Sequence, residues 1–88
     1  MKRAQANEVM VVDAFSLIKN HLGSKRIDKG DHLFASTHEI LGVIEEERDE
    51  LKGAIHKNDD YEIQCELLDL ITASIWGLIS LRSKTLDW

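Results

Sequence analysis

The sequence of 88 residues contains no proline and only five glycines. Because these two residue types interrupt regular secondary structure, few positions remain that could punctuate short strands. Between the glycines the apolar residues recur with a period near 3.6, which is the period of an α-helix. The chain is therefore predicted to be all-α.

The first predicted helix lies near the N-terminus. Asn7 is a suitable N-cap, and the apolar stripe that follows predicts a helix to about His21, with Gly23 as its stop signal. Residues 23–31 contain two glycines and three basic residues but almost nothing apolar. We expect this segment to be the main loop of the protein, where basic charge concentrates.

Two longer helices are predicted in the rest of the chain. Residues 36–39 fit the S-x-x-E capping box, so the second helix is expected to begin at Ser36 and to continue to about residue 57. A turn at 58–60 then leads into a third helix, over about 60–82. The three main helices are expected to form one antiparallel helical bundle spanning residues 1–88.

A chain of this size buries only about 60 to 65% of its unfolded surface, and small domains often need additional stabilisation. The only cysteine is Cys65, so no intramolecular disulfide can form. The third helix also carries more apolar surface than the other two can cover. We therefore expect a homodimer, or a dimer of dimers, in which the helices over 36–57 and 60–82 form a four-helix core with their symmetry mates.

The net charge of the chain and its hydropathy pattern limit the partners and the location that we expect. Sixteen acidic and eleven basic residues give a net charge of −5, which argues against nucleic-acid binding. The N-terminal residues lack the apolar region of a signal peptide. The most apolar stretch, 67–81, is interrupted by polar residues and is shorter than the roughly 20 residues of a membrane span. The expected location is the cytoplasm, without membrane insertion.

The second predicted helix carries an acidic residue within its apolar face. At 100° per residue Glu47 falls inside the apolar arc, with Glu50 at its edge, whereas Glu45 and Asp49 project to the opposite side. The arc consists of Ile40, Val43, Ile44, Leu51, Ala54 and Ile55. A run of acids such as 45–50 is usually a solvated charged face, but the inward position of Glu47 argues for another role.

The third predicted helix repeats this anomaly. Glu66 and Asp69 are three residues apart, hence on one face, in a stretch that is otherwise almost entirely apolar. Four carboxylates from two neighbouring helices would repel one another unless they were protonated or bridged by cations. Oxygen ligands favour Mg²⁺, with Mn²⁺ as a possible substitute, and Mg²⁺ sites commonly bind substrate phosphates.

Residues 46–50, followed after fifteen residues by 66–69, resemble the E-E-x-x-E … E-x-x-D signature of the MazG-like all-α nucleoside triphosphate pyrophosphohydrolase superfamily. The similarity covers roughly residues 36–82. Phosphoribosyl-ATP pyrophosphohydrolase, a relative of similar size, is a minor alternative within the same chemistry.

The resemblance implies a Mg²⁺-dependent hydrolase that cleaves a nucleoside triphosphate between its α and β phosphates and releases pyrophosphate, as in the clearance of non-canonical nucleotides. It implies that Glu47, Glu50, Glu66 and Asp69 are the metal ligands. Glu46 matches the first acid of the motif and would orient or deprotonate the attacking water. Catalysis would thus involve Glu46, Glu47 and Glu50.

The residues that contact substrate are less constrained by the sequence. Lys25, Arg26, Lys29 and Lys57 are candidates for binding the outer phosphates, although each could equally be a solvated surface base. Trp76 could stack on a nucleobase, but its apolar neighbours favour a core position. An alternative function is a non-catalytic helical module that dimerises or senses a nucleotide.

Other chemistries are disfavoured. The four histidines, His21, His32, His38 and His56, contain no H-x-x-x-H pair, and one cysteine cannot complete a zinc site. Cys65 has no partner motif and is interpreted as an inert thiol.

Overall fold

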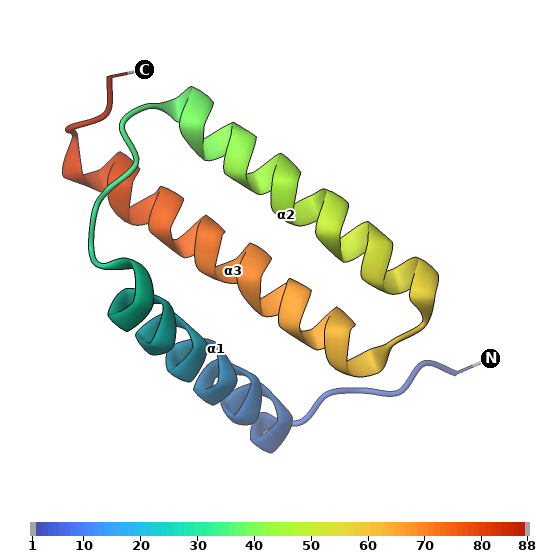
Figure 1. Ribbon diagram of the computed structural model, residues 1–88. Coiled ribbons are helices and arrows are strands. Elements are labelled where there is room, and N and C mark those ends of the chain that lie inside the picture. Colours follow the sequence, from blue (N-terminus) through green and yellow to red (C-terminus); the bar gives the residue numbers. More distant parts are fainter. Residues whose placement is uncertain (1, 88) are drawn as a thin grey trace.

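The computed structural model describes residues 2–87. Three helices make up its regular structure: α1 (Glu8–Lys29), α2 (Thr37–Lys57) and α3 (Asp60–Ser83). No strand occurs among residues 2–87, which confirms the all-α prediction. α3 lies between the other two helices, antiparallel to α2, and α1 packs along its other side (Figure 1). Within the described residues, α1 and α2 do not contact each other.

The ends of α2 agree with the sequence prediction. The Ser36 hydroxyl accepts a hydrogen bond from the Glu39 backbone N–H at 3.1 Å, while the Glu39 carboxylate accepts one from the backbone of Ala35 at 3.2 Å. At the other end Asn58 adopts a left-handed conformation, with φ 59°. Asp59 then caps α3 by accepting a hydrogen bond from the Glu62 backbone N–H at 3.0 Å.

The prediction of a loop over 23–31 is wrong. α1 continues through Gly23 and ends at Lys29, where Gly30 has φ 79° and donates its N–H to the Arg26 carbonyl at 2.9 Å. A glycine inside a helix costs only about 1 kcal/mol, and Leu22, Lys25 and Arg26 near Gly23 are good helix formers. Gly30 is therefore the true C-terminal stop, and the basic residues of this segment lie on the last two turns of α1.

The connection between α1 and α2 is held against α3. The Trp76 indole Nε1 donates to the His32 carbonyl at 2.7 Å, the Phe34 N–H donates to the Ser80 hydroxyl at 3.0 Å, and the Asp87 N–H donates to the Ala35 carbonyl at 2.6 Å. These bonds hold the connection, and with it the end of α1, against α3.

Small residues form the tightest part of the packing. Ala54, Ala73 and Ser80 are 1%, 8% and 0% exposed, and Gly77 is also buried. A Cβ atom at Gly77 would lie 3.1 Å from Cγ2 of Ile40. The lack of a side chain at Gly77 therefore allows α2 and α3 to approach closely.

Replacing Gly77 with Val should destabilise the protein by about 1–3 kcal/mol, because the added methyl groups overpack the α2–α3 contact. The free energy of unfolding can be measured by urea denaturation. Gly53→Val is the matched control: a Cβ atom at Gly53 has no neighbour within 4 Å. Equal destabilisation by the two substitutions would show that α2 and α3 do not pack at Gly77.

α3 is unusually apolar. Among the described residues it is the one helix long and apolar enough to cross a membrane by length and composition, with a mean hydropathy of 1.3 over 18 residues, of which 17% are buried within the chain. The buried central helix of a protein in water meets the same criterion.

Candidate metal centre

The four carboxylates predicted as metal ligands converge between α2 and α3. One oxygen from each of Glu47, Glu50, Glu66 and Asp69 lies within 4.8 Å of the others. Glu47 and Glu50 are one turn apart on α2, and Glu66 and Asp69 are one turn apart on α3, so each helix contributes one pair. Glu50 is exposed, while the other three are half-buried. The close packing of the two helices brings the pairs together.

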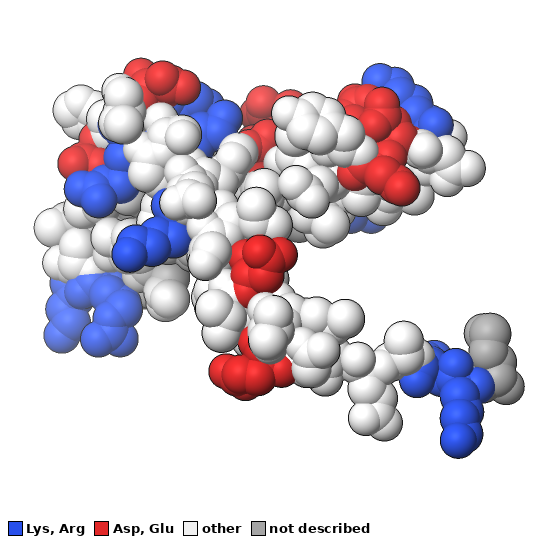
Figure 2. All heavy atoms as spheres, turned by 90° about the horizontal axis from the view of Figure 1, so that it is seen from below, with Lys and Arg blue, Asp and Glu red and all other residues white. Residues whose placement is uncertain are grey.

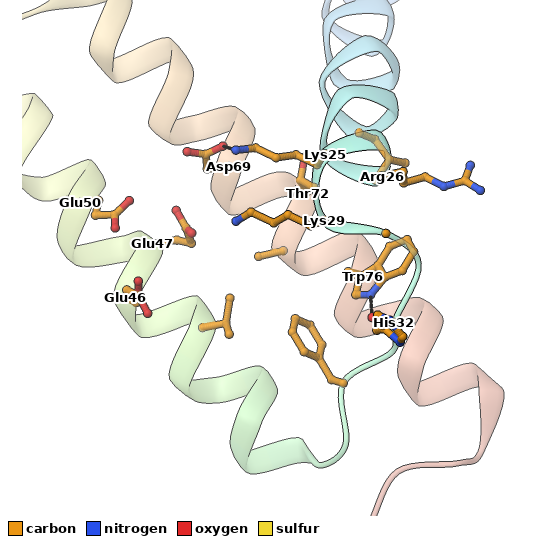
Figure 3. A pocket seen from close by; sticks show the side chains of 15 residues that line it. Lys25, Arg26, Lys29, His32, Glu46, Glu47, Glu50, Asp69, Thr72 and Trp76 are labelled. Carbon is orange, nitrogen blue, oxygen red and sulfur yellow. Dashed lines mark hydrogen bonds and ion pairs between the residues drawn. The ribbon is translucent and has the colours of Figure 1, made fainter.

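The remaining acidic residues of α2 include two that were predicted to project away from the apolar face. Glu45 and Asp49 are exposed, as expected for the side away from α3. Glu46 is also exposed, but its side chain lines the cleft beside Glu47 and Glu50 (Figure 3). The acidic run is thus divided between a solvated face and a face directed toward the cluster.

The cluster carries unbalanced negative charge. Burial raises the pKa of Glu47 to about 7, with further contributions from Glu50, Asp69, Glu66 and Glu46. Burial also raises the pKa of Glu66, as do its hydrogen bond and repulsion with Glu50 and its repulsion with Asp69. Both shifts reflect carboxylates that are removed from solvent and held close to one another.

Two buried oxygens in this cluster lack partners. Glu47 Oε2 and Glu66 Oε2 are inaccessible to solvent and make no hydrogen bond. A buried carboxylate oxygen without a partner is costly, whereas a hard divalent cation would satisfy it. The donor set contains only carboxylate oxygens, which suits Mg²⁺ or Mn²⁺ better than Zn²⁺. The residues therefore fit a divalent metal site.

The last turns of α1 place nitrogen donors opposite the acids. His21 Nε2 lies 2.7 Å from Asp69 Oδ1, and Lys25 Nζ lies 3.6 Å from the same oxygen. Lys29 extends in the same direction, toward the gap between Asp69 and Glu47 (Figure 3). Since His21, Lys25 and Lys29 are spaced by four residues, they share one face of α1.

Two of the four basic candidates do not face the acids, although Arg26 borders the same cleft. The Arg26 guanidinium points away from the cluster (Figure 3) and binds both Asp31 carboxylate oxygens, at 2.8 and 3.2 Å. This contact raises the pKa of Arg26 and lowers that of Asp31. Lys57 lies at the end of α2, pairs with Glu62 at 3.2 Å, and does not line the cleft. Lys25 and Lys29 are the basic candidates that face the acids.

An open cleft of about 510 Å³ is bordered by Glu46, Glu47, Glu50 and Asp69 and by the two lysines, whereas Glu66 is not part of its lining. Phe34, Val43 and Trp76 also line this cleft. Trp76 lies at the end away from Glu46, Glu47 and Glu50 (Figure 3). Trp76 was predicted as a core residue, but it is half-buried and lines this cleft, held by its bond to the connection after α1. One space therefore combines a carboxylate cluster, two ammonium groups and an aromatic surface.

No protein-family model, curated protein or solved structure matches this chain.

His21 is the residue of the site that the sequence prediction missed. The sequence pattern gives His21 no role beyond the approximate end of the first predicted helix and one of four histidines that do not form a zinc site. The four-residue spacing of His21, Lys25 and Lys29 is the signal that could have identified His21. This spacing places the three residues on one face only if the helix continues through Gly23.

Proposed function

We propose that this protein is a Mg²⁺-dependent nucleoside triphosphate pyrophosphohydrolase, which cleaves its substrate between the α and β phosphates. The observation that carries the proposal is the convergence of four carboxylates within 4.8 Å, with two unpartnered buried oxygens, across a cleft from Lys25 and Lys29. The resemblance of residues 46–50 and 66–69 to the pyrophosphohydrolase signature supports the same chemistry.

In this proposal Glu47, Glu50, Glu66 and Asp69 hold the metal. Bound Mg²⁺ supplies charge neutralisation at the phosphates and lowers the pKa of water. Lys25 and Lys29 bind the outer phosphates from the opposite wall of the cleft. The nucleoside occupies the aromatic end, beside Phe34 and Trp76, where a flat base can stack.

In this proposal Glu46 acts on the attacking water. It is exposed at the cleft wall, next to the carboxylate cluster, and is free to orient a water molecule and accept its proton. The water oxygen bonds to the α-phosphorus, the bond from that phosphorus to the α–β bridging oxygen breaks, and pyrophosphate leaves. No covalent intermediate with the protein is required.

The direct test is to incubate the purified protein and Mg²⁺ with a panel of ribo- and deoxyribonucleoside triphosphates. Release of nucleoside monophosphate and pyrophosphate is expected. Release of orthophosphate instead would place the cleavage at the outer phosphate, and no turnover with any member of the panel would contradict the proposed activity.

A non-catalytic assembly or nucleotide-sensing module is the second candidate, and the exposed apolar surface favours it. On α1, Val9, Met10, Val12 and Phe15 are 55 to 76% exposed. The N-terminal segment and the first half of α1 extend away from the body of the molecule across an open hollow (Figure 2). Nucleotide binding to the Mg²⁺-loaded protein without turnover would favour this candidate.

Both candidates include a homodimer. The chain exposes 7196 Å², whereas a compact monomer of its mass, 10.0 kDa, exposes about 5,200 Å². The excess exceeds the roughly 800 Å² that each partner buries in a standard protein interface. An apolar groove on a second face of the α2–α3 pair, lined by Ile40, Ile44, Gly77, Leu78 and Leu81, is the proposed seat of a four-helix core with a second copy.

Light scattering should therefore give twice the monomer mass, and Leu78→Glu should shift the protein toward the monomer. Leu78 is 57% exposed beside this groove, so a carboxylate there would be buried without a partner in the dimer. Ile27→Glu, at a side chain on α1 that is 87% exposed, is the matched control and should remain dimeric. A wild-type protein that is monomeric at all concentrations would contradict the proposed core.

A further inference from the structure

We infer that Lys25 is a counter-ion that the metal displaces: it pairs with Asp69 in the metal-free protein and is released to the substrate phosphates when a divalent cation occupies the cluster. The inference rests on the proposed metal site, and it adds that the metal binds before the phosphates. It also assigns different roles to two neighbouring groups of α1, Lys25 and His21.

The geometry separates these two groups. His21 Nε2 lies 2.7 Å from Asp69 Oδ1, within hydrogen-bond distance, and both side chains are 22% exposed. An ionised carboxylate can only accept, so the imidazole donates. Lys25 Nζ lies 3.6 Å from the same oxygen, beyond a good hydrogen bond, and its side chain is 35% exposed. The contact with His21 is the tighter of the two.

The lysine is therefore the group that a metal can replace. Its ammonium is a single charge on a flexible four-carbon stem, and an ion pair of this exposure contributes little stability. A divalent cation bound by Asp69 brings twice the charge and repels the ammonium at this distance. His21 can stay bound to Asp69 as a positioning residue, as hydrogen-bonded partners of metal-ligating carboxylates commonly do.

The released ammonium remains beside the cleft. Lys25 and Lys29 border the same open space as Glu46, Glu47 and Glu50. A phosphate chain bound to the metal would be the nearest anion for Lys25 once Asp69 is occupied. Without metal, Lys25 neutralises Asp69 and the remaining acids repel phosphates. Phosphate binding should therefore require prior metal binding.

The test measures binding and not turnover. Mg²⁺ affinity is determined from the melting temperature during a Mg²⁺ titration, and the affinity for methylenebisphosphonate, a non-hydrolysable pyrophosphate analogue, is measured by calorimetry with saturating Mg²⁺. Lys25→Met should bind Mg²⁺ more tightly by up to about fivefold, the limit expected for an exposed ion pair. The same variant should bind the analogue more weakly than wild type, whereas Lys25→Arg should restore both affinities toward wild type.

Two control variants separate this exchange from general charge effects. Lys29→Met removes an equal charge from the same cleft, but no ion pair joins Lys29 to Asp69 within residues 2–87, so its effect on Mg²⁺ affinity should be smaller. Arg26→Met should leave the Mg²⁺ affinity unchanged, because that guanidinium binds Asp31 and points away from the carboxylate cluster.

Unchanged or weaker Mg²⁺ binding by Lys25→Met, or an equal gain in Lys29→Met, would overturn the exchange while leaving the metal site intact. A wild-type protein that binds no divalent cation would overturn both the inference and the proposed function. His21→Ala should weaken Mg²⁺ binding, and His21→Gln, which can still donate to Asp69, should recover part of it. Equal affinities in these two variants would contradict the positioning role of His21.

Discussion

Asp69→Asn and Glu50→Gln should each reduce the release of pyrophosphate at least about 100-fold. Loss of a hydrogen-bonded partner of a ligand already costs 10- to 100-fold in metal affinity or activity, and these substitutions remove a ligand charge itself. The measurement is the initial rate with the best substrate of the nucleotide panel, at saturating Mg²⁺. Glu50 is exposed, so Glu50→Gln should leave the fold intact.

The matched controls are Glu45→Gln and Asp49→Asn. They remove the same charge from the same helix, but both side chains are exposed on the face away from α3. Their rates should stay within about twofold of wild type, as expected when a distant surface charge is removed in a screened solution. If a control lost as much activity as Glu50→Gln, net charge rather than the cluster would explain the effect.

Mg²⁺ should stabilise the protein strongly at pH 8 and hardly at all at pH 4.5. At a concentration 100 times the dissociation constant, a ligand adds about 2.7 kcal/mol to the free energy of unfolding. For a domain of this size that corresponds to a rise in melting temperature of about 10–20 °C. The rise should disappear at low pH, because protonated carboxylates do not bind the cation.

The metal-free protein should show the opposite pH dependence. The pKa of Glu47 is raised from 4.5 to about 7 in the folded state. Between these values the folded chain retains a proton that the unfolded chain has lost, so the free energy of unfolding falls as pH rises from 4.5 to 7. The upward shift at Glu66 acts in the same direction. The stability gained by protonation is therefore present at low pH and lost by about pH 7.

Glu47→Gln isolates this contribution. The amide is neutral at every pH, so the melting temperature of the metal-free variant should fall less between pH 4.5 and 7 than that of wild type. Calorimetry in chelator-treated buffers measures how the melting temperature of each protein changes with pH. Parallel slopes for the two proteins would mean that Glu47 is not the group that titrates with folding.

The sequence was sufficient to predict the helices whose ends carry strong local signals. Ser36 and Asp59 cap α2 and α3 as expected, since capping depends on residues within one turn. The cluster between these helices was also predictable, because the acids stand at helical spacing in apolar stripes. Their convergence depends only on the two helices packing side by side.

The C-terminal half of α1 could not be placed in this way. Gly23 and Gly30 are both plausible helix stops, and the local cost of a glycine inside a helix is too small to decide between them. The contacts that favour the longer helix are tertiary, such as that of Lys25, beyond Gly23, with Asp69 of α3. Likewise, nothing near Trp76 in the sequence indicates its bond to the connection after α1.

The separation of α1 from α2 gives the two walls of the cleft different mechanical properties. The carboxylate wall is built on the α2–α3 pair, where small residues allow close packing, so its geometry is set before any ligand arrives. The lysine wall is carried by α1, which contacts only α3 of the other two helices and has no fully buried residue. Movement of α1 would require loss of the bonds that hold the connection after it to α3, but of no contact between α2 and α3. The lysines would then move while the acids stayed in place.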